Sequence, residues 1–279
     1  MSEADFLAAM AAASRARVEA ARAKRTEREL RARAADSAQP PRLQLSARRF
    51  DVIAEVKFRS PAAGRLREGA DASVLARVAG YAEAGAVAVS VLTEPKRFDG
   101  SMQHLEVAVR ALAGRIPAMR KDFLVDPYQI LEARVAGAGG ALVILRMLDD
   151  TQVRALLDCA IEQRLFVLLE AFDAQDIERA QTLVRAYARR AELLVGLNAR
   201  DLKTLQVVPG QLEKLVRTLP DSVARVAESG VSTAAEAGRL AVAGYDVALV
   251  GSALMNALEP LPLLRAMISA GRTERARRS

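Results

Sequence analysis

Residues 141–169 read ALVILRMLDDTQVRALLDCAIEQRLFVLL, and the rest of the fold can be worked out from this stretch. Two short apolar runs, 141–145 and 165–169, lie on either side of a longer stretch that is typical of a helix. Both runs are continuously apolar rather than alternating, as in strands that are covered on both faces. Strand, helix and strand in this order predict the βα unit of a parallel sheet.

The same unit recurs from residue 51 onward. Strands are expected at 51–56, 86–91, 117–120, 141–145, 165–169, 193–197, 223–227 and 246–250. Successive strands start 23 to 35 residues apart, so each interval can hold one helix and two loops. A doubly wound sheet would show the same alternation, but eight evenly sized units in about 220 residues favour closure. The predicted fold class is therefore α/β, a single (β/α)8 TIM barrel.

The segments before and after the barrel have a different composition. Residues 4–35 are rich in Ala, Arg and Glu and nearly free of Gly and Pro, which favours one long helix. The Gln-Pro-Pro sequence at 39–41 ends that helix. Three parts are expected, namely an N-terminal helical extension at 1–49, a catalytic barrel domain at 50–271 and a basic C-terminal tail at 272–279. Whether the extension packs on the barrel mouth or frays is left open.

The composition limits the kinds of site that the chain can build. With 51% hydrophobic and 27% charged residues, the chain can bury a full core. Cys159 is the single cysteine and His104 the single histidine, which excludes an intramolecular disulfide, a cysteine-rich zinc site and a multi-histidine metal site. No metal is therefore expected, and we expect both residues to serve packing or to be exposed.

The net charge of +7 comes from the two ends of the chain. Residues 1–50 contribute +5 and residues 265–279 contribute +4, whereas the part between them carries −2. No aromatic platform or known binding motif accompanies the basic ends, so no nucleic-acid partner is expected. No apolar run is long enough to span a membrane, and the N-terminus does not resemble a signal peptide. We expect a cytoplasmic protein without a membrane partner, and a barrel that can work as a monomer.

Charged and amide side chains follow several predicted strands at their carboxyl ends, where barrel enzymes hold their catalytic groups. These residues are Glu55, Lys57, Lys121, Glu170, Asn198, Arg200 and Glu228. A single charged residue at a strand end is commonly part of a loop or of a surface ion pair. However, Glu and Lys are rarely buried unless paired, and here they meet at one rim. The cluster predicts acid–base catalysis.

Small residues follow the last two predicted strands. Ser229 and Gly230 come after the seventh strand, and Gly251 and Ser252 come after the eighth and open a helix. Small residues let backbone N–H groups and a helix N-terminus face an anion, and these two loops often bind phosphate in barrel enzymes. Either loop alone could be an ordinary glycine turn. Together with the charged cluster they predict an enzyme that acts on a phosphorylated small molecule.

The motifs at these strand ends resemble those of the indole-3-glycerol phosphate synthase family, which closes the indole ring in tryptophan biosynthesis. The resemblance covers roughly residues 50–265, and the N-terminal helix is similar to the family's helix before the barrel. The matching strings, in the family's order, are IAEVK (53–57) with Ser60, Pro61 and Gly64, SVLTE (90–94), FDGS (98–101), RKDFLVDPYQILEAR (120–134), LLE (168–170), GLNARDL (196–202), AESG (227–230) and VGSALM (250–255). Each string alone is weak, but together at the correct strand ends they are specific.

The resemblance implies a reaction and roles for the charged residues. The substrate would be 1-(2-carboxyphenylamino)-1-deoxyribulose 5-phosphate, and the product indole-3-glycerol phosphate, with loss of CO2 and water and without any cofactor. Lys121 would be the general acid at the ketone, with a pKa that desolvation and neighbouring cations can lower towards neutrality. Glu170, held with Asn198, would be the base in a later proton transfer. Lys57 would pair with the substrate carboxylate and take part in dehydration.

The resemblance implies binding roles for the other residues. Glu55 and Glu228 would orient the lysines and the substrate hydroxyls, and Arg200 would support the anthranilate end. The apolar pocket for the aromatic ring would be lined by Pro61, Phe98, Phe123 and Leu142. The phosphate and its neighbouring hydroxyl would be surrounded by Ser60, Ser229, Gly230, Gly251 and Ser252.

Three positions depart from the family's pattern. Ala63 stands where lysine is common, Ala199 where Asn or Ser is usual, and Phe172 where His is frequent. None of them removes a proposed acid, base or phosphate contact, but they leave room for a specialised or silenced paralogue.

Two other functions remain as alternatives. A related barrel isomerase, similar to phosphoribosylanthranilate isomerase, would share the phosphate loops alone, and the Glu-Val-Lys string at 55–57 and the RKDF string at 120–123 argue against it. A non-catalytic scaffold or RNA-binding protein that uses the basic ends would leave the charged cluster without an explanation.

Overall fold

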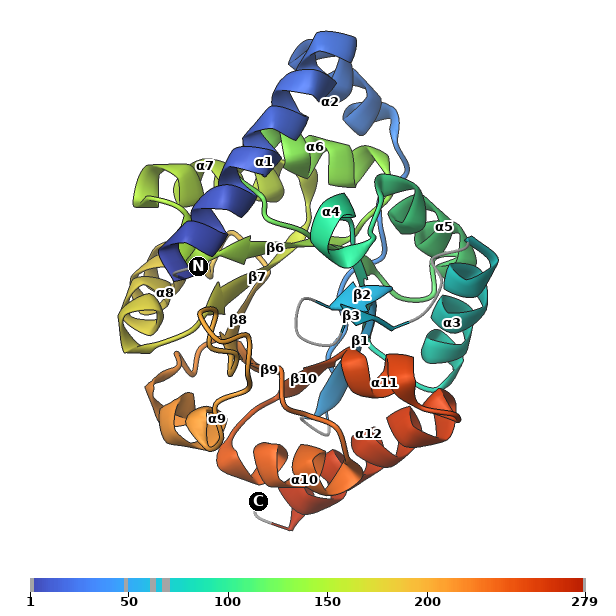
Figure 1. Cartoon of the computed structure of the whole chain (residues 1–279), viewed down its shortest axis with the longest axis vertical. Coiled ribbons are helices and arrows are strands. Elements are labelled where there is room, and N and C mark those ends of the chain that lie inside the picture. Colours follow the sequence, from blue (N-terminus) through green and yellow to red (C-terminus); the bar gives the residue numbers. More distant parts are fainter. Residues whose placement is uncertain (1–2, 48–49, 61–63, 67–70, 278–279) are drawn as a thin grey trace.

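The computed structural model describes residues 3–47, 50–60, 64–66 and 71–277. Eight parallel strands form a closed barrel in the spatial order β1-β10-β9-β8-β7-β6-β5-β4 (Figure 1). The strands are Asp51–Val56 (β1), Ala88–Leu92 (β4), Ala118–Lys121 (β5), Gly140–Ile144 (β6), Phe166–Ala171 (β7), Leu193–Asn198 (β8), Ala224–Glu228 (β9) and Val247–Val250 (β10). The ring closes where β1 pairs with β10, with Asp51 opposite Val247. The predicted (β/α)8 TIM barrel is confirmed.

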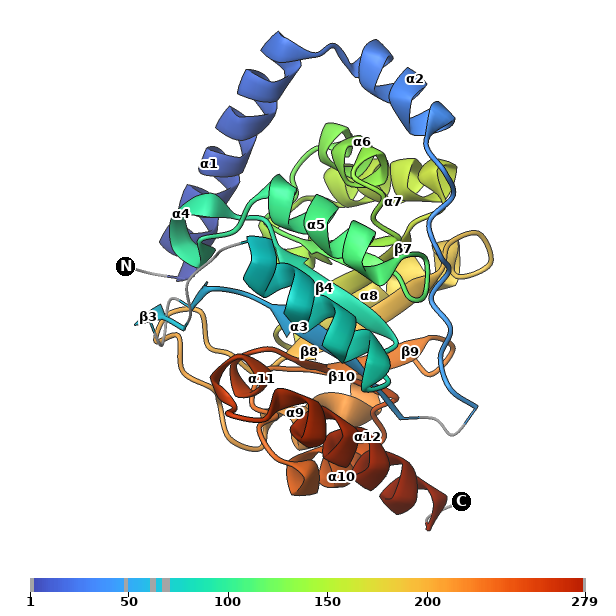
Figure 2. The same ribbon diagram turned by 90° about the vertical axis from the view of Figure 1, so that its right-hand side faces the viewer.

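Helices surround this barrel (Figures 1 and 2). They are Asp71–Glu83 (α3), Met102–Leu112 (α5), Pro127–Val135 (α6), Asp150–Gln163 (α7), Ala174–Tyr187 (α8), Gln211–Leu215 (α9), Ala234–Ala243 (α10) and Pro260–Ala276 (α12). Shorter elements lie in the loops, namely Pro95–Phe98 (α4), Ser252–Asn256 (α11), the 3-10 turns Leu145–Met147 (η1) and Val216–Thr218 (η2), and a hairpin of Arg59–Ser60 (β2) and Gly64–Arg65 (β3). No helix in the described ranges is both long enough and apolar enough to cross a membrane.

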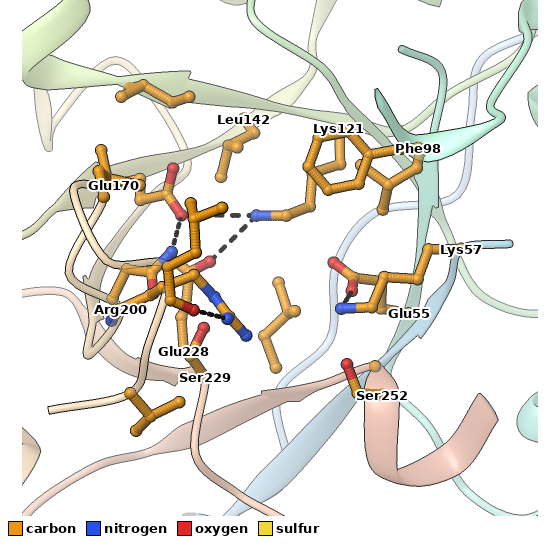
Figure 3. Close-up of a pocket in the computed structure, with 18 of the residues that line it drawn as sticks. Glu55, Lys57, Phe98, Lys121, Leu142, Glu170, Arg200, Glu228, Ser229 and Ser252 are labelled. Atoms are coloured by element: carbon orange, nitrogen blue, oxygen red, sulfur yellow. Dashed lines mark hydrogen bonds and ion pairs between the residues drawn. The ribbon is translucent and has the colours of Figure 1, made fainter. Parts of the chain in front are cut away.

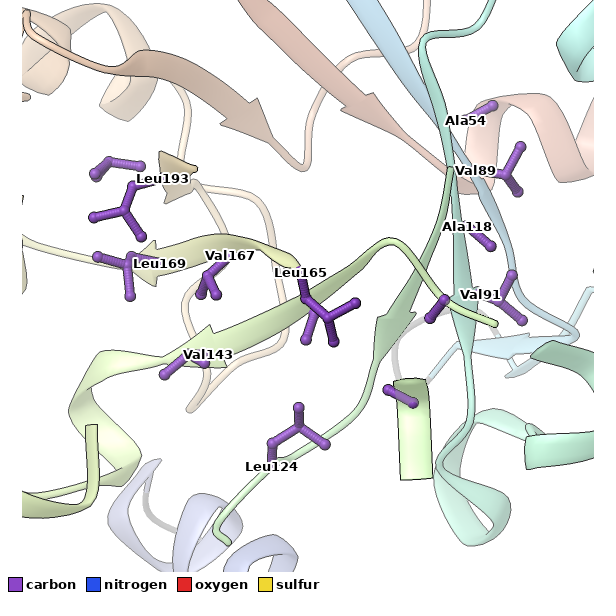
Figure 4. Close-up of a cluster of buried hydrophobic side chains, with 14 of the residues drawn as sticks. Ala54, Val89, Val91, Ala118, Leu124, Val143, Leu165, Val167, Leu169 and Leu193 are labelled. Atoms are coloured by element: carbon purple, nitrogen blue, oxygen red, sulfur yellow. The ribbon is translucent and has the colours of Figure 1, made fainter. Parts of the chain in front are cut away.

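Residues of each strand face the barrel interior and the helices in alternation. Val143, Val167 and Leu169 belong to the apolar layer between strands and helices (Figure 4), and each is fully buried. Leu168 and Phe166 belong instead to the cluster that fills the barrel interior. Burying one such side chain contributes about 1.5–3 kcal/mol to folding, and a strand with two apolar faces gains on both. This double burial explains why the strands are continuously apolar in sequence.

The N-terminal extension consists of two helices, Glu3–Lys24 (α1) and Glu27–Asp36 (α2), so the prediction of one helix over 4–35 was wrong. The break lies at Thr26, whose hydroxyl accepts a hydrogen bond from the Glu29 amide at 3.3 Å. In return, the Thr26 amide donates to the Glu29 carboxylate at 2.8 Å. This reciprocal capping box starts a new helix because it satisfies amides that the first turn leaves free.

The extension packs on the barrel. Figure 2 shows α1 on the same side as α4 and the β2–β3 hairpin, which is the side of the carboxyl strand ends. Arg17 of α1 forms an ion pair with Asp122 at 2.6 Å, and Arg22 forms one with Asp126 at 2.8 Å. At the end of α2, the buried Arg134 of α6 donates to the carbonyl oxygens of Ser37 and Ala38. The described residues of the extension thus pack against the barrel rather than fray, which the sequence had left open.

A tail was expected to begin at residue 272, but the last helix, α12, continues to Ala276. Arg272 donates to the Phe50 carbonyl at 3.1 Å and pairs with the buried Asp51 at 2.7 Å. Arg275 pairs with Asp246 at 3.1 Å. Basic residues in this segment therefore hold the closing strands of the barrel, β1 and β10, to the outer layer.

Candidate active site

A cavity of about 300 Å³ opens at the carboxyl ends of the strands (Figure 3). Among its lining residues are nearly all of the positions predicted from the sequence: Glu55, Lys57, Phe98, Lys121, Phe123, Leu142, Glu170, Asn198, Arg200, Glu228, Ser229, Gly230, Gly251 and Ser252. Pro61 and Ala63 lie outside the described residues, and so does the side chain of Ser60. The structure thus brings the described candidates together in one site.

Lys121 is the centre of the charged cluster. Its Nζ lies 3.2 Å from Glu228 Oε2 and 3.5 Å from Glu170 Oε1, and both carboxylates are almost fully buried. Asn198 Nδ2 donates to Glu170 Oε1 at 2.7 Å. The four residues come from four strands, β5, β7, β8 and β9, and they meet because each strand ends at the same rim with an inward-facing position.

This arrangement shifts two pKa values. Burial works to lower the pKa of Lys121, but the charges of Glu170, Glu228 and Glu55 outweigh it and raise that pKa above its ordinary value. Burial, together with the charge of Glu170, raises the pKa of Glu228 to about 8 against the opposing effect of Lys121. The expected lowering of the Lys121 pKa is therefore wrong for the free protein, because three carboxylates surround this lysine. Lys121 carries its proton, as a general acid must.

A second ion pair lies on the β1 side of the cavity. Lys57 Nζ is 2.6 Å from Glu55 Oε1, and both residues face the interior because they are two positions apart at the end of β1. Burial raises the pKa of Glu55, but Lys57, Lys121 and Arg200 lower it further than burial raises it. Glu55 therefore stays ionised beside Lys57.

Arg200 connects the cavity to the loop after β8. Its backbone amide donates to Asn198 Oδ1 at 3.0 Å, and its guanidinium donates to the carbonyl of Leu205. Arg200 also forms a β-bridge with Val207, so the loop folds back over the cavity. Leu202, Leu205 and Val207 consequently line the cavity. Leu202 ends the GLNARDL string but was given no role from the sequence, and no motif had indicated the other two.

Aromatic side chains form the wall opposite this loop. The Phe98 and Phe123 ring centroids are 6.1 Å apart, and Phe6 of α1 meets Phe123 edge to face at 6.0 Å. Phe6 and Leu7 also line the cavity, which the sequence did not predict because the position of the extension was unknown. Helix α1 is thus part of the site.

Phe172 adds a further aromatic wall at the end of β7. The Arg146 guanidinium lies over its ring at 4.6 Å from the centroid, and Asp176 accepts hydrogen bonds from both Arg146 Nε and the Phe172 amide. Burial raises the pKa of Asp176 although Arg146 opposes it. Arg146 and Asp176 therefore hold the Phe172 ring in its position. Ala199, another position that departs from the family pattern, is buried beside the site and donates its amide to the Glu228 carbonyl.

Loops of small residues form the remaining side. Ser229 and Gly230 both have left-handed backbone conformations, with φ of 65° and 78°. Gly251 precedes α11, which Ser252 opens. Ser232 and Ala253 line the cavity beside them. Left-handed backbone turns of this kind expose amide groups, which suits an anionic group of a ligand.

Cys159 and His104 lie away from the cavity. Cys159 is buried in α7, where burial raises its thiol pKa to about 12. The His104 ring packs edge to face on Phe58 with the centroids 5.0 Å apart. Over the described ranges, no group of three or more His, Cys, Asp or Glu side chains is arranged to hold a metal ion.

Taken as chemistry, the cavity offers a protonated lysine between two carboxylates, a second Lys–Glu pair, an aromatic wall and a small-residue rim. These features suit a ligand with an apolar ring, a carbonyl group and anionic ends. Figure 3 shows the charged side chains of Lys121, Glu170 and Glu228 directed towards one another within the cavity.

Comparison with known proteins assigns this architecture to a family. The family model described as "Indole-3-glycerol phosphate synthase" matches residues 7–266. Proteins of that name are similar to the chain: one from Micrococcus luteus at 45% identity over 80% of both chains, and one from Nocardioides sp. at 44% over 86% of this chain and 88% of its own. A third, from Mycobacterium tuberculosis, is 40% identical over 86% of this chain and 85% of its own.

Solved structures share the fold at low sequence identity. The 3-hexulose-6-phosphate synthase from Salmonella typhimurium superposes with a TM-score of 0.63 at 16% identity, over 80% of this chain and 99% of its own. Thiamine phosphate pyrophosphorylase from Pyrococcus furiosus gives 0.57 at 14% identity, over 81% and 97%. Both support the barrel architecture and nothing more specific.

Proposed function

The chain belongs to the indole-3-glycerol phosphate synthase family, and on this premise we propose roles for the residues of its cavity. The reaction is the ring closure of 1-(2-carboxyphenylamino)-1-deoxyribulose 5-phosphate to indole-3-glycerol phosphate, with loss of CO2 and water. The enzyme is accordingly a lyase of tryptophan biosynthesis. A substrate of this kind has an aromatic carboxylate at one end, a phosphate at the other and a ketone between them, and the cavity offers apolar, charged and small-residue surfaces that suit these groups.

Lys121 is proposed as the general acid of ring closure. Its ammonium group donates a proton to the ketone oxygen while the ring carbon that bears the carboxylate forms a bond to the ketone carbon. The raised pKa of Lys121 keeps the ammonium protonated before the reaction starts. Loss of CO2 then returns the electrons of the broken bond to the ring. The apolar surface of Phe98, Phe123 and Leu142 favours this loss because it disfavours the free carboxylate.

Glu170 is proposed as the base of the dehydration that follows. The hydroxyl made from the ketone leaves as water after protonation, and a base removes a proton from the neighbouring carbon. Glu170 has the position for this step because Asn198 holds its Oε1 at 2.7 Å and Lys121 lies beside it. Lys57 supplies a cation for the substrate carboxylate and takes part in the dehydration, with Glu55 to orient it.

The remaining residues are proposed to bind the substrate. Glu228 orients Lys121 and a substrate hydroxyl, and Arg200 supports the anthranilate end. Pro61 completes the apolar pocket in this proposal. The phosphate is assigned to Ser60, Ser229, Gly230, Gly251 and Ser252. We also propose that the enzyme acts as a cytoplasmic monomer without a nucleic-acid partner, which light scattering and a salt titration with RNA would test.

The observation that carries the proposal is the contact of Lys121 with both Glu170 and Glu228. A fluorescence assay for indole-3-glycerol phosphate tests it, with Lys121→Ala as the variant and the exposed Lys214→Ala of α9 as the matched control. We expect Lys121→Ala to lower kcat by about 10³-fold, within the range of general acid catalysis, and Lys214→Ala to leave it unchanged. Undiminished turnover by Lys121→Ala would overturn the role. Substrate binding without turnover by the wild type would identify a silenced paralogue, and isomerase activity alone would favour the related barrel isomerase.

A further inference from the structure

Gly196 lies on β8 directly beneath the charged cluster. It faces the barrel interior, as Leu194 and Asn198 do on the same strand, and its strand neighbour is Glu170 on β7. A Cβ atom built on Gly196 would lie 2.1 Å from Glu228 Oε1 and 3.1 Å from Glu228 Cδ. Non-bonded carbon and oxygen atoms cannot approach so closely, because attraction between non-bonded heavy atoms is best at about 3.5–4.0 Å. Any side chain at residue 196 therefore requires the Glu228 carboxylate to move.

The backbone at this position does not explain the glycine. Gly196 is paired on both sides within the sheet, with Glu170 and with Val226, and its φ is not in the left-handed region. Alanine can adopt this conformation and, in a strand interior, costs less conformational entropy than glycine. The position therefore needs the space that glycine leaves rather than its flexibility.

The contacts of Glu228 show why the space over Gly196 matters for its side chain. Its Oε2 is held by Lys121 at 3.2 Å, whereas Oε1 is buried and has no hydrogen-bond partner among the described residues. Glu228 is only 1% exposed, so the carboxylate cannot turn towards solvent. Packing over Gly196 therefore helps to decide where this carboxylate lies.

The same relationship occurs at the other ion pair. A Cβ built on Gly251 would lie 2.1 Å from Glu55 Oε1 and 2.9 Å from Lys57 Nζ. Each of these buried glutamates thus lies over a glycine, Gly196 within the neighbouring strand β8 or Gly251 directly after the neighbouring strand β10, and pairs with a lysine there. Gly251 also lines the cavity, whereas Gly196 is not among the cavity-lining residues, which makes Gly196 the clearer position to test.

We propose that Gly196 is a positioning residue for catalysis, whose missing side chain lets the Glu228 carboxylate lie against Lys121. The inference rests on the proposed function, because it assumes that Lys121 and Glu228 act on the substrate. A methyl group at residue 196 displaces the carboxylate by on the order of 1 Å, and misplacement on this scale can cost about 10²-fold in rate. Gly196 acts through Glu228 and does not touch the substrate.

The first experiment compares Gly196→Ala with Gly140→Ala in steady-state kinetics and thermal unfolding. Gly140 is the matched control, because a Cβ there would lie 2.4 Å from the Phe166 ring in the barrel interior, away from the cavity. We expect Gly196→Ala to lower kcat by about 10²-fold with KM changed less than threefold. Gly140→Ala should lower Tm and leave kcat within twofold of the wild type. An unchanged kcat in Gly196→Ala would overturn the proposal.

The second experiment compares the Glu228→Ala variant with the double variant that carries Glu228→Ala and Gly196→Ala. Without the carboxylate the severe overlap is gone and Leu168 Cδ1 at 3.1 Å remains, which is the end of a side chain and can shift by a few tenths of an ångström. Gly196→Ala should therefore cost less than threefold in kcat there, and the two effects should not add. If Gly196→Ala does not fold, the double variant should fold with the Tm of Glu228→Ala. A full 10²-fold loss in the double variant, or its failure to fold, would overturn the proposal.

A crystal structure of Gly196→Ala separates this inference from the proposed function. We expect the separation of Lys121 Nζ and Glu228 Oε2 to grow beyond 4 Å, the outer limit of an ion pair. This result would support the positioning role even if the wild type turned over no substrate. An unchanged separation of 3.2 Å would overturn the positioning role even if the wild type were fully active.

Discussion

Lys121 Nζ and Glu228 Oε2 lie 3.2 Å apart although 107 positions separate the two residues in the chain. Glu170 lies on the other side of the same lysine at 3.5 Å. Burial, together with the charge of Glu170, raises the pKa of Glu228 to about 8, because one ammonium group does not offset the burial of two carboxylates. Glu228 therefore binds a proton more readily than an exposed glutamate does.

Replacing Glu228 by Gln should change how stability depends on pH. The folded pKa of Glu228 is raised to about 8 from an ordinary 4.5, so the folded state holds a proton that the unfolded state releases. The contribution of Glu228 to wild-type stability therefore falls as pH rises from about 4.5 to 8, whereas glutamine cannot ionise. Glu228→Gln should match the wild type near pH 4 and exceed it by a few kcal/mol at pH 8.

Urea unfolding of the substrate-free protein at a series of pH values measures this difference. Glu178→Gln, on the exposed face of α8, serves as the control and should follow the wild type throughout. A stability gap between Glu228→Gln and the wild type that stays constant from pH 4 to 8 would contradict the prediction.

Phe172→Ala should weaken substrate binding more than it slows turnover. The ring lines the cavity and is fixed by Arg146 at 4.6 Å, but it carries no group that moves a proton. Loss of this apolar wall should raise KM by about 10- to 100-fold, because a hydrophobic contact with the substrate contributes about 1–3 kcal/mol. Steady-state kinetics measure both constants. Phe166→Leu, in the barrel interior, should lower Tm and leave KM unchanged, and a drop in kcat alone for Phe172→Ala would argue against the binding role.

Arg17→Gln should loosen helix α1 from the barrel mouth. Arg17 pairs at 2.6 Å with the buried Asp122, which directly follows Lys121 in the sequence. Loss of this ion pair should lower the free energy of unfolding by about 1–3 kcal/mol. Amides of α1 should then exchange hydrogen faster, and KM should rise because Phe6 and Leu7 lose their fixed positions. Hydrogen-exchange mass spectrometry measures the first effect, with the exposed Arg28→Gln of α2 as the control. Unchanged exchange in α1 would show that apolar packing alone holds this helix.

Truncation after Gly271 should destabilise the whole barrel. It removes Arg272, the partner of the buried Asp51 on β1, and Arg275, the partner of Asp246 at the start of β10. Leaving a buried carboxylate unpaired should lower the free energy of unfolding by about 3 kcal/mol. Chemical denaturation measures this change, and Arg277→Ala, an exposed position, should have no effect. A truncated protein as stable as the full chain would instead assign residues 272–279 to a dispensable tail.

The parts of the fold that sequence reasoning predicted correctly depend on local pattern. Continuous apolar runs located all eight strands to within two residues, and polar residues directly after them located the charged cluster. The start of β4 was placed at residue 86 instead of Ala88, because Ala86 and Val87 are apolar but belong to the connection that leads from the left-handed Gly85 into the strand. Apolar character alone does not distinguish a strand from a buried turn that leads into it.

The parts that were missed depend on contacts between distant segments. Phe6 and Leu7, and the loop residues Leu202, Leu205 and Val207, reach the cavity only because α1 and the loop after β8 fold over it. No local motif encodes such docking. The break between α1 and α2 did have a local signal, since Thr26 and Glu29 have the spacing of a capping box. The direction of the Lys121 pKa shift could be decided only from distances, because it depends on how many carboxylates come close.

The pairing of β1 with β10 has a consequence for how the protein regains activity after denaturation. Asp51 and Val247 meet although they are 196 positions apart in the chain, so this contact carries a high entropic cost of loop closure and is expected to form late. Glu55 reaches its place over Gly251 only when the pairing is complete. Recovery of turnover in a refolding experiment should therefore lag behind the recovery of helical circular dichroism. The delay would measure how long the barrel takes to close between β1 and β10.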